Sequence, residues 1–271
     1  MNYNYFIPII HLGPLEGYTF NQVLPLLQIE NVIIGNKAKF EIIRKVFCNK
    51  TLLHQENKII NFNQGNWTNK QSATFEWDYK KSKKKICYIE TQINLLRGKG
   101  LKTSSLPAFY VNYTSKNKKS FMSCGNEKYG NPRVILQMKE FGMWVDGYPG
   151  VNINKQKKTS YSLVIINPYK AMNSLFIEIN SLAIKKNIKV PAFSTKLINF
   201  YDIVNKGVWS GQFYIYGKRR AIIHLINHEF KNYNNITTLE HSDPFRAELT
   251  YFPKFQSLRN KIHKKLKGLL D

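Results

Sequence analysis

Residues 161–195 read YSLVIINPYKAMNSLFIEINSLAIKKNIKVPAFST, and they carry the clearest indication of the fold. Residues 162–167 are rich in β-branched side chains and lack polar alternation, which is typical of a strand covered on both faces of a parallel sheet. Asn167 and Pro168 come next, and these residue types suit an N-cap and a first helical position. The sequence therefore predicts a strand that ends at Asn167 and a helix that begins at Pro168.

An apolar stripe continues the predicted helix. Its members recur at spacings of three and four residues: Met172, Leu175, Phe176, Ile179, Leu182 and Ala183. Lys185 and Lys186 suit the last turn, where cations complement the helix dipole, and residues 190–193 begin a second buried strand. We expect a right-handed β-α-β unit and, from it, an α/β domain with helices on both faces of a mostly parallel sheet.

Other segments fit the same architecture and divide the chain. Strands are expected at 31–35, 86–90, 108–113 and 213–216, and helices at 20–30, 37–47 and 218–230. The predicted organisation is an N-terminal arm at 1–27, one α/β domain at 28–230 and a basic C-terminal extension at 231–271, with insertions at about 61–85 and 115–158.

The charge balance points to a polyanionic partner. Lysine and arginine total 41 against 17 aspartate and glutamate, which gives a net charge of +24. This excess is too large for a typical metabolic enzyme, and phosphates of a nucleic acid or an anionic membrane surface would neutralise it. No apolar run approaches the roughly 18 to 20 residues that span a bilayer, so we expect no membrane span.

Five basic segments are candidate phosphate contacts. Their lysines and arginines are Lys80, Lys81, Lys83, Lys84, Lys85, Lys116, Lys118, Lys119, Lys155, Lys157, Lys158, Lys218, Arg219, Arg220, Lys261, Lys264, Lys265 and Lys267.

Signals for catalysis, cofactors and metals are weak. Gly35 and the run from Gly98 to Gly100 are the only hints of phosphate-cradling loops, and neither matches a nucleotide-binding motif. His224 and His228 have helical spacing but lack the H-E-x-x-H order of a zinc site. We therefore predict no catalytic residues, no cofactor and no metal. The three cysteines, Cys48, Cys87 and Cys124, are far apart and odd in number, which favours free thiols in a reducing compartment.

The central unit resembles the C-terminal β-α-β of the ribosomal protein S-two family, the second protein of the small ribosomal subunit. Asn167-Pro168 stands for the family's Asp-Pro, Lys170 matches its helix lysine, and residues 187–191 (NIKVP) resemble its Gly-Ile-Pro step. Ser194-Thr195 stands for Asp-Thr. Residues 214–222 (YIYGKRRAI) resemble the family's Tyr-Pro-Ile-Pro-Gly-Asn-Asp-Asp loop and following helix, with the acidic pair replaced by basic residues. Weaker matches are residues 30–34 (ENVII), 109–112 (FYVN) and 11–13 (HLG). The family's long helical hairpin has no counterpart.

This resemblance implies a flavodoxin-like three-layer fold without a catalytic role. The implied function is that of a structural constituent of the small ribosomal subunit, which binds small-subunit rRNA and neighbouring ribosomal proteins and is not a free homo-oligomer. A composition typical of AT-rich genomes and a start without a presequence favour a divergent, organelle-encoded form in the mitochondrial matrix. Two alternatives stay open. One is an accessory subunit of a mitochondrial respiratory complex, and the other is a nucleotide-binding α/β enzyme.

Overall fold

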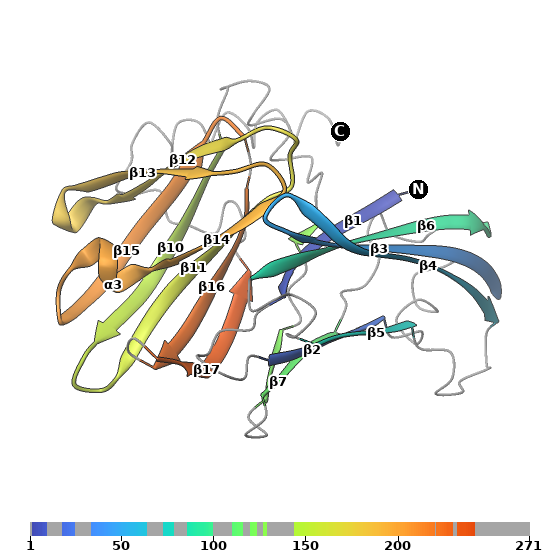
Figure 1. The fold of residues 1–271 in the computed structure, drawn as a ribbon, viewed down its shortest axis with the longest axis horizontal. Helices are drawn as coiled ribbons and strands as arrows, with labels where there is room; N and C mark the ends of the chain where they lie inside the picture. The colour runs from blue at the N-terminus through green and yellow to red at the C-terminus, as the bar shows by residue number, and fades with distance from the viewer. Residues whose placement is uncertain are drawn as a thin grey trace.

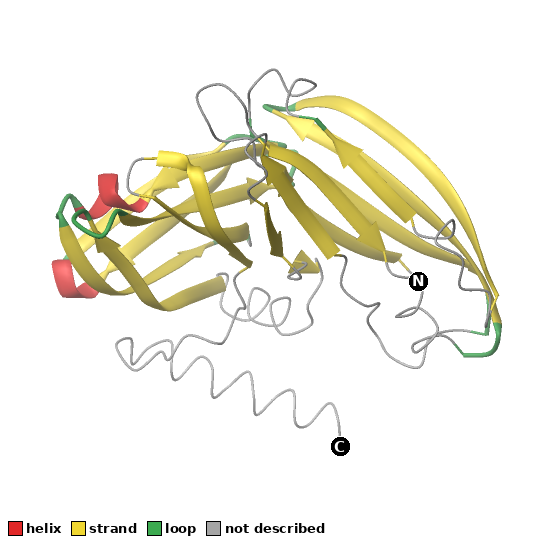
Figure 2. Ribbon diagram, turned by 90° about the horizontal axis from the view of Figure 1, so that it is seen from below, coloured by secondary structure: helices red, strands yellow, loops and turns green. Residues whose placement is uncertain are grey.

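The fold consists of antiparallel β-sheets. The computed structural model describes residues 2–9, 18–24, 34–63, 73–78, 86–99, 110–115, 120–123, 127–128, 144–219, 221–229 and 232–241. Every strand pairing among them is antiparallel, and their helical elements are the 3-10 turn η3 (Asn180–Leu182) and the short helix α3 (Phe200–Val204). The predicted α/β flavodoxin-like fold with a mostly parallel sheet is therefore wrong (Figures 1 and 2).

The segment predicted as a helix after Pro168 is a β-hairpin. Strand β11 (Thr159–Asn167) is followed by β12 (Asn173–Ile179), which pairs with β13 (Ile184–Val190). In β12 the buried side chains alternate, with Leu175, Ile177 and Ile179 on the core side. The buried side chains thus recur every second residue and include Ile177, which the predicted helical stripe left out. This alternation is favoured over a helix because it buries a complete face of a sheet.

Asn167 is the residue that turns the chain between β11 and β12. Its side-chain oxygen accepts a hydrogen bond from the backbone N–H of Tyr169 at 3.1 Å, as in an Asx-turn rather than a helix cap. Its amide nitrogen lies 2.9, 3.0 and 2.8 Å from the carbonyl oxygens of Ala171, Val190 and Pro191. The fully buried Asn167 thus ties the start of the hairpin to its end.

Other predicted helices are also strands. Residues 37–47 lie in β3 (Lys37–Cys48), 222–229 form β16 (Ile222–Glu229), and the described part of 20–30 belongs to β2 (Tyr18–Leu24). The strand expected at 190–193 gives way to a turn after Val190. Of the expected strands, residues 87–90, 110–113 and 213–216 lie in β6 (Cys87–Arg97), β7 (Tyr110–Ser115) and β15 (Val208–Gly217), and residues 108 and 109 lie outside the described residues. The strand expected at 31–35 is wrong for its described residues, because Ile34 and Gly35 form a bend.

The eight-stranded sheet at the left of Figure 1 curls over its own core, and we call this unit the sandwich because two groups of its strands face each other. Strand β10 (Trp144–Asn154) pairs with β11 only at the turn, through Asn154 and Thr159. Beyond that turn the strands lie in two layers. One layer consists of β13, β12, β15 and β10, and the other layer consists of β14 (Ser194–Asn199), β11, β16 and β17 (Asn232–His241). The core between the layers includes Leu163, Ile165, Leu175, Ile177, Phe213 and Ile223.

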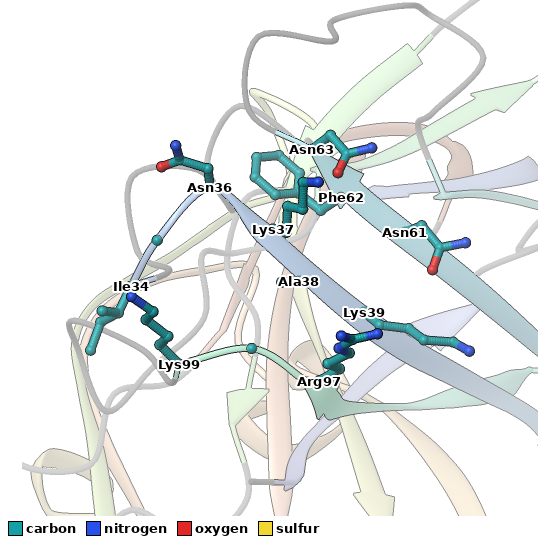
Figure 3. A pocket seen from close by; sticks show the side chains of 12 residues that line it. Ile34, Asn36, Lys37, Ala38, Lys39, Asn61, Phe62, Asn63, Arg97 and Lys99 are labelled. Atoms are coloured by element: carbon teal, nitrogen blue, oxygen red, sulfur yellow. The ribbon is translucent and has the colours of Figure 1, made fainter.

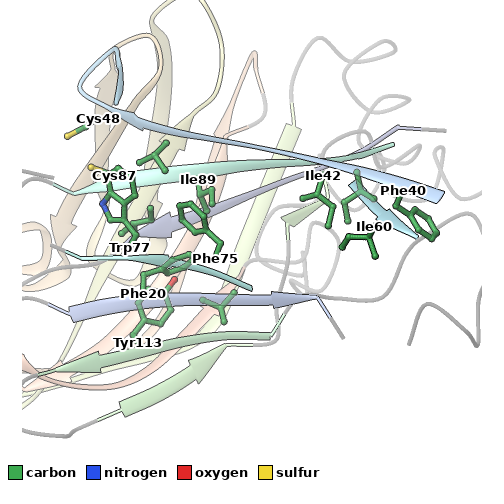
Figure 4. Close-up of a cluster of buried hydrophobic side chains, with 14 of the residues drawn as sticks. Phe20, Phe40, Ile42, Cys48, Ile60, Phe75, Trp77, Cys87, Ile89 and Tyr113 are labelled. Carbon is green, nitrogen blue, oxygen red and sulfur yellow. The ribbon is translucent and has the colours of Figure 1, made fainter. Parts of the chain in front are cut away.

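The other strands form two sheets that pack on each other. The five-stranded sheet has the order β4 (Thr51–Asn63), β3, β6, β1 (Asn2–Ile9) and β9 (Glu127–Lys128). The four-stranded sheet has the order β5 (Ala73–Trp77), β2, β7 and β8 (Ser120–Ser123). Their shared core, drawn in Figure 4, includes Phe20, Phe40, Ile42, Phe75, Ile89 and Tyr113.

A buried arginine connects these two sheets. The guanidinium of Arg44 donates to the Glu56 carboxylate at 2.7 Å and to the Gln22 side-chain oxygen at 3.0 Å, and Thr91 donates to that same oxygen. Burial lowers the pKa of Arg44, and the hydrogen bond and charge of Glu56 oppose this shift. Arg44 therefore stabilises the contact between the two sheets, with its buried guanidinium bonded to Glu56 and Gln22.

The sandwich covers one end of the five-stranded sheet. Tyr88 packs against Ile166 and Ile222 of the sandwich, and Val164 and Ile226 join the core beneath the five-stranded sheet. The arrowheads of β4 and β6 point away from the sandwich in Figure 1. That far end, where β3 begins and β4 and β6 end, carries the candidate site.

Candidate functional site

A cleft of about 850 Å³ lies at the far end of the five-stranded sheet (Figure 3). It is lined by the bend that precedes β3, the first residues of β3, and the last residues of β4 and β6. The lining residues are Ile34, Gly35, Asn36, Lys37, Ala38, Lys39, Asn61, Phe62, Asn63, Arg97, Gly98 and Lys99.

Four cations surround the cleft, although Arg97 follows Lys39 by 58 positions in the sequence. Lys37 and Lys39 come from β3, whereas Arg97 and Lys99 come from the end of β6 and the residues after it. Lys39 and Arg97 are register partners on adjacent antiparallel strands. Like charges placed directly opposite in a sheet repel each other, so this pairing costs folding free energy.

The four charges lack compensation within the described part of the chain. None of these side chains forms an ion pair with a described carboxylate. Glu41, two residues beyond Lys39 on the same face, accepts a hydrogen bond from Asn94 at 2.8 Å instead. The described lining contains no aspartate or glutamate. The cleft is therefore a concave site of positive charge.

Glycines shape the rim of this cleft. Gly35 and Gly98 have φ angles of +90° and +149°, which favour glycine over residues with a side chain. A Cβ on Gly35 would lie 3.6 Å from Cδ of Lys99, so the two segments are in contact. The structure thus brings together Gly35 and part of the Gly98 to Gly100 run, the two weak hints of a phosphate-cradling loop in the sequence. Gly100 itself lies outside the described residues.

Amide side chains complete the lining. Asn36, Asn61 and Asn63 each offer two N–H donors and a carbonyl acceptor. Such groups can bond sugar hydroxyls and base edges, while lysine and arginine bind phosphates. No histidine, cysteine or carboxylate lines the described part of the cleft, and the arrangement suits binding of an anionic sugar-phosphate chain.

The sequence-predicted contacts that the structure describes lie elsewhere. Lys155, Lys157 and Lys158 are exposed in the β10–β11 turn, where Lys158 lies 3.6 Å from the Glu229 carboxylate. Lys218 and Arg219 follow the other end of β15, and the Arg219 guanidinium lies 6.0 Å from the Tyr169 ring centroid. These two basic segments are therefore separated by the length of β15, and neither lines the cleft.

The remaining predicted contacts lie outside the described residues. They are Lys80, Lys81, Lys83, Lys84, Lys85, Lys116, Lys118, Lys119, Arg220, Lys261, Lys264, Lys265 and Lys267.

His228 serves a structural role in the sandwich. Its Nδ1 lies 2.7 Å from the Glu229 carbonyl oxygen, which can only accept, and its Nε2 lies 2.9 Å from the Ser162 hydroxyl; in the neutral ring Nδ1 therefore donates and Nε2 accepts. His224 is buried on the same strand. No group of three metal-ligating side chains occurs among the described residues.

A second, smaller hollow of about 450 Å³ lies beside β4 and β5. His54 contacts the rings of Phe75 and Trp77 there. Two carboxylates, Glu56 and Glu76, line this hollow, which makes it a poor site for an anion.

Comparisons with known proteins give no indication of function. No protein family, no curated protein and no solved structure matches this chain. Among the described residues, no helix has the length and apolar character needed to cross a membrane.

Proposed function

We propose that this protein is a non-catalytic RNA-binding protein whose cationic cleft contacts the phosphate backbone. The proposal rests chiefly on one observation: Lys39 and Arg97 are register partners on adjacent strands, in a cleft that Lys37 and Lys99 also line. Four cations at one rim, without a carboxylate partner among the described residues, are tolerated best when an anion neutralises them. A phosphate backbone supplies such charges at regular intervals.

An extended polyanion fits better than a single small anion. The net charge is +24, far more than one cleft requires, and exposed cations also occur at the β10–β11 turn and after β15. These groups lie on separate parts of the molecule. A long, folded chain of phosphates can reach several such groups at once, and release of its counterions favours binding.

RNA suits this distribution better than a membrane surface does. A bilayer presents a flat anionic plane and would select for cations on one flat face. Here the charges line a concave cleft together with three asparagine amides, which can bond ribose hydroxyls and base edges. Binding of an anionic membrane, as in the respiratory-complex alternative, is an outcome of the test below. The α/β enzyme alternative required a fold that the antiparallel sheets contradict.

The assignment to a mitochondrial small ribosomal subunit is narrower and stays a prediction. The segment that suggested the S-two family forms the β12–β13 hairpin rather than a helix. We therefore retain an RNA partner as the proposal. Sedimentation of the chain with small-subunit rRNA, lost on nuclease treatment, would support the ribosomal assignment and its protein partners.

Fluorescence anisotropy of the full chain tests the proposal. The probes are a labelled structured RNA and a labelled single-stranded RNA, and vesicles with anionic lipid are measured by co-sedimentation. We expect RNA affinity to fall with salt, with a slope of log K against log salt of about −3 or steeper, as four or more phosphate contacts imply. Binding to vesicles without binding to RNA would favour the membrane alternative. Absence of salt-dependent binding to both would contradict a polyanion-binding function.

A further inference from the structure

Two cysteines that are 39 residues apart in sequence lie at adjoining ends of β3 and β6. Phe47 on β3 and Tyr88 on β6 are register partners, and their rings stack with centroids 5.3 Å apart. The strands are antiparallel, so one step forward on β3 and one step back on β6 leads to Cys48 and Cys87. Cys48 ends β3, and Cys87 begins β6 and is also paired with Ile9 of β1.

Further contacts place the two cysteines in the same part of the core. Both side chains belong to the core between the five-stranded and four-stranded sheets, and both are buried. Sγ of Cys48 lies 3.8 Å from the carbonyl oxygen of Ile86, the neighbour of Cys87. Figure 4 shows both cysteines at the same end of this core.

From this geometry we propose that Cys48 and Cys87 are a cross-strand dithiol that a low-molecular-weight disulfide converts to an intramolecular disulfide. Directly opposed residues of an antiparallel pair have Cβ atoms about 4.5 to 5.5 Å apart, and a disulfide needs about 3.5 to 4.5 Å. A small approach of the two strand ends closes this difference.

The reaction is balanced by reduction of the small disulfide. The Cys48 thiolate attacks one sulfur of the oxidant, forms a mixed disulfide and releases the first thiolate. The Cys87 thiolate then attacks Sγ of Cys48, forms the Cys48–Cys87 bond and releases the second thiolate. The two protons of the protein thiols end on the two small thiols. The protein is oxidised by two electrons, and the small disulfide is reduced by two.

Cys48 is the entry point for the reagent. Cys48 is 6% exposed and Cys87 is fully buried, so the first attack needs an opening of the strand end. Cys48 directly precedes a turn in which Asn49 and Lys50 have φ angles of 45° and 74°. The Lys50 backbone N–H donates to the Phe193 carbonyl at 3.1 Å, which holds this turn on the sandwich. Exchange is therefore slower than at a surface thiol.

The disulfide would join the two strands that carry the cleft. Lys37 and Lys39 lie at the other end of β3 from Cys48, and Arg97 lies at the other end of β6 from Cys87. The crosslink would hold the two strands together at the end remote from the cleft. This inference rests on strand register and holds whatever ligand the cleft binds.

Peptide mapping of the oxidised full chain tests this site. The native protein is treated with oxidised glutathione, the remaining thiols are alkylated, and trypsin digestion is performed without reductant. We expect residues 46–50 to be linked to residues 86–97, in the natural chain and in the Cys124→Ser variant. The Cys48→Ser and Cys87→Ser variants should lack this linked peptide.

A thermal melt provides the second measurement. The oxidised form should melt about 5 °C above its reduced form, a shift that the identically treated Cys48→Ser variant should not show. Recovery of both peptides in alkylated form, or a crosslink that contains residues 120–128 with Cys124, would overturn the proposal. A 46–50 to 86–97 link that forms only in denaturant would overturn it as well.

Discussion

Lys39 and Arg97 lie directly opposite each other on β3 and β6, with no described carboxylate paired to either. Two cations in this position repel each other in the free protein, and a bound anion would relieve the repulsion. The pair therefore links the stability of the sheet to the function proposed for the cleft.

Neutralising one member of this pair should stabilise the free protein. For Lys39→Gln we expect the free energy of unfolding to rise by about 0.2 to 1 kcal/mol, since an opposed like-charge pair is removed. Urea titration at low salt measures this change, and Lys206→Gln, an exposed lysine of the sandwich, is the matched control. A clear loss of stability in Lys39→Gln alone would show that the pair is structural.

Glu90 should make stability depend on pH. Burial raises the pKa of this carboxyl, and the charge of Lys45, its register partner on β3, opposes the shift. Because the folded-state pKa is the higher one, the stabilising contribution is complete below the usual pKa of 4.5 and is lost as the pH rises through the folded-state pKa.

Glu90→Gln keeps the side chain neutral at every pH. We expect this variant to be more stable than the natural chain at pH 7, and the difference to vanish below about pH 4. Denaturant titrations at several pH values measure it, with the exposed Glu76→Gln as control. A difference that is constant with pH would assign the effect to packing rather than to charge.

Asn167 should be among the least replaceable residues of the sandwich. Asn167→Asp would place a carboxylate against the carbonyl oxygens of Ala171, Val190 and Pro191, and an unpaired buried charge costs about 3 to 5 kcal/mol. Chemical denaturation should show this loss, whereas Asn187→Asp at an exposed position of β13 should change stability by less than about 0.5 kcal/mol. Equal effects of both changes would refute the structural role assigned to Asn167.

Turns and apolar runs could be predicted from the sequence, whereas the choice between helix and strand could not. Asn167 does bond a backbone N–H two residues on, as predicted for a cap, but the chain it turns is a hairpin. In residues 172–183 a helical stripe and a strand alternation coexist, and periodicity alone cannot choose between them. In residues 222–226 every side chain is buried, so no alternation marks the strand.

The cleft was harder to predict because its residues are distant in sequence. Runs of lysine mark charge density along the chain, whereas the pairing of β3 with β6 is what brings together Lys37, Lys39, Arg97 and Lys99. The local signals were the glycines at positions 35 and 98, which permit the bends at the rim. The same long-range pairing aligns Cys48 with Cys87, which their sequence spacing concealed.

The RNA affinity of a Lys39→Gln/Arg97→Gln double variant shows whether RNA binds at the cleft. The matched control is Lys186→Gln/Lys206→Gln, which removes the same charge from exposed positions on the sandwich. Fluorescence anisotropy with one structured RNA at fixed salt should show affinity reduced about tenfold or more in the cleft variant, with a salt slope shallower by about 1 to 2, and a smaller loss in the control. Equal losses in the two double variants, with equal salt slopes, would contradict the claim that the cleft is the RNA-binding site.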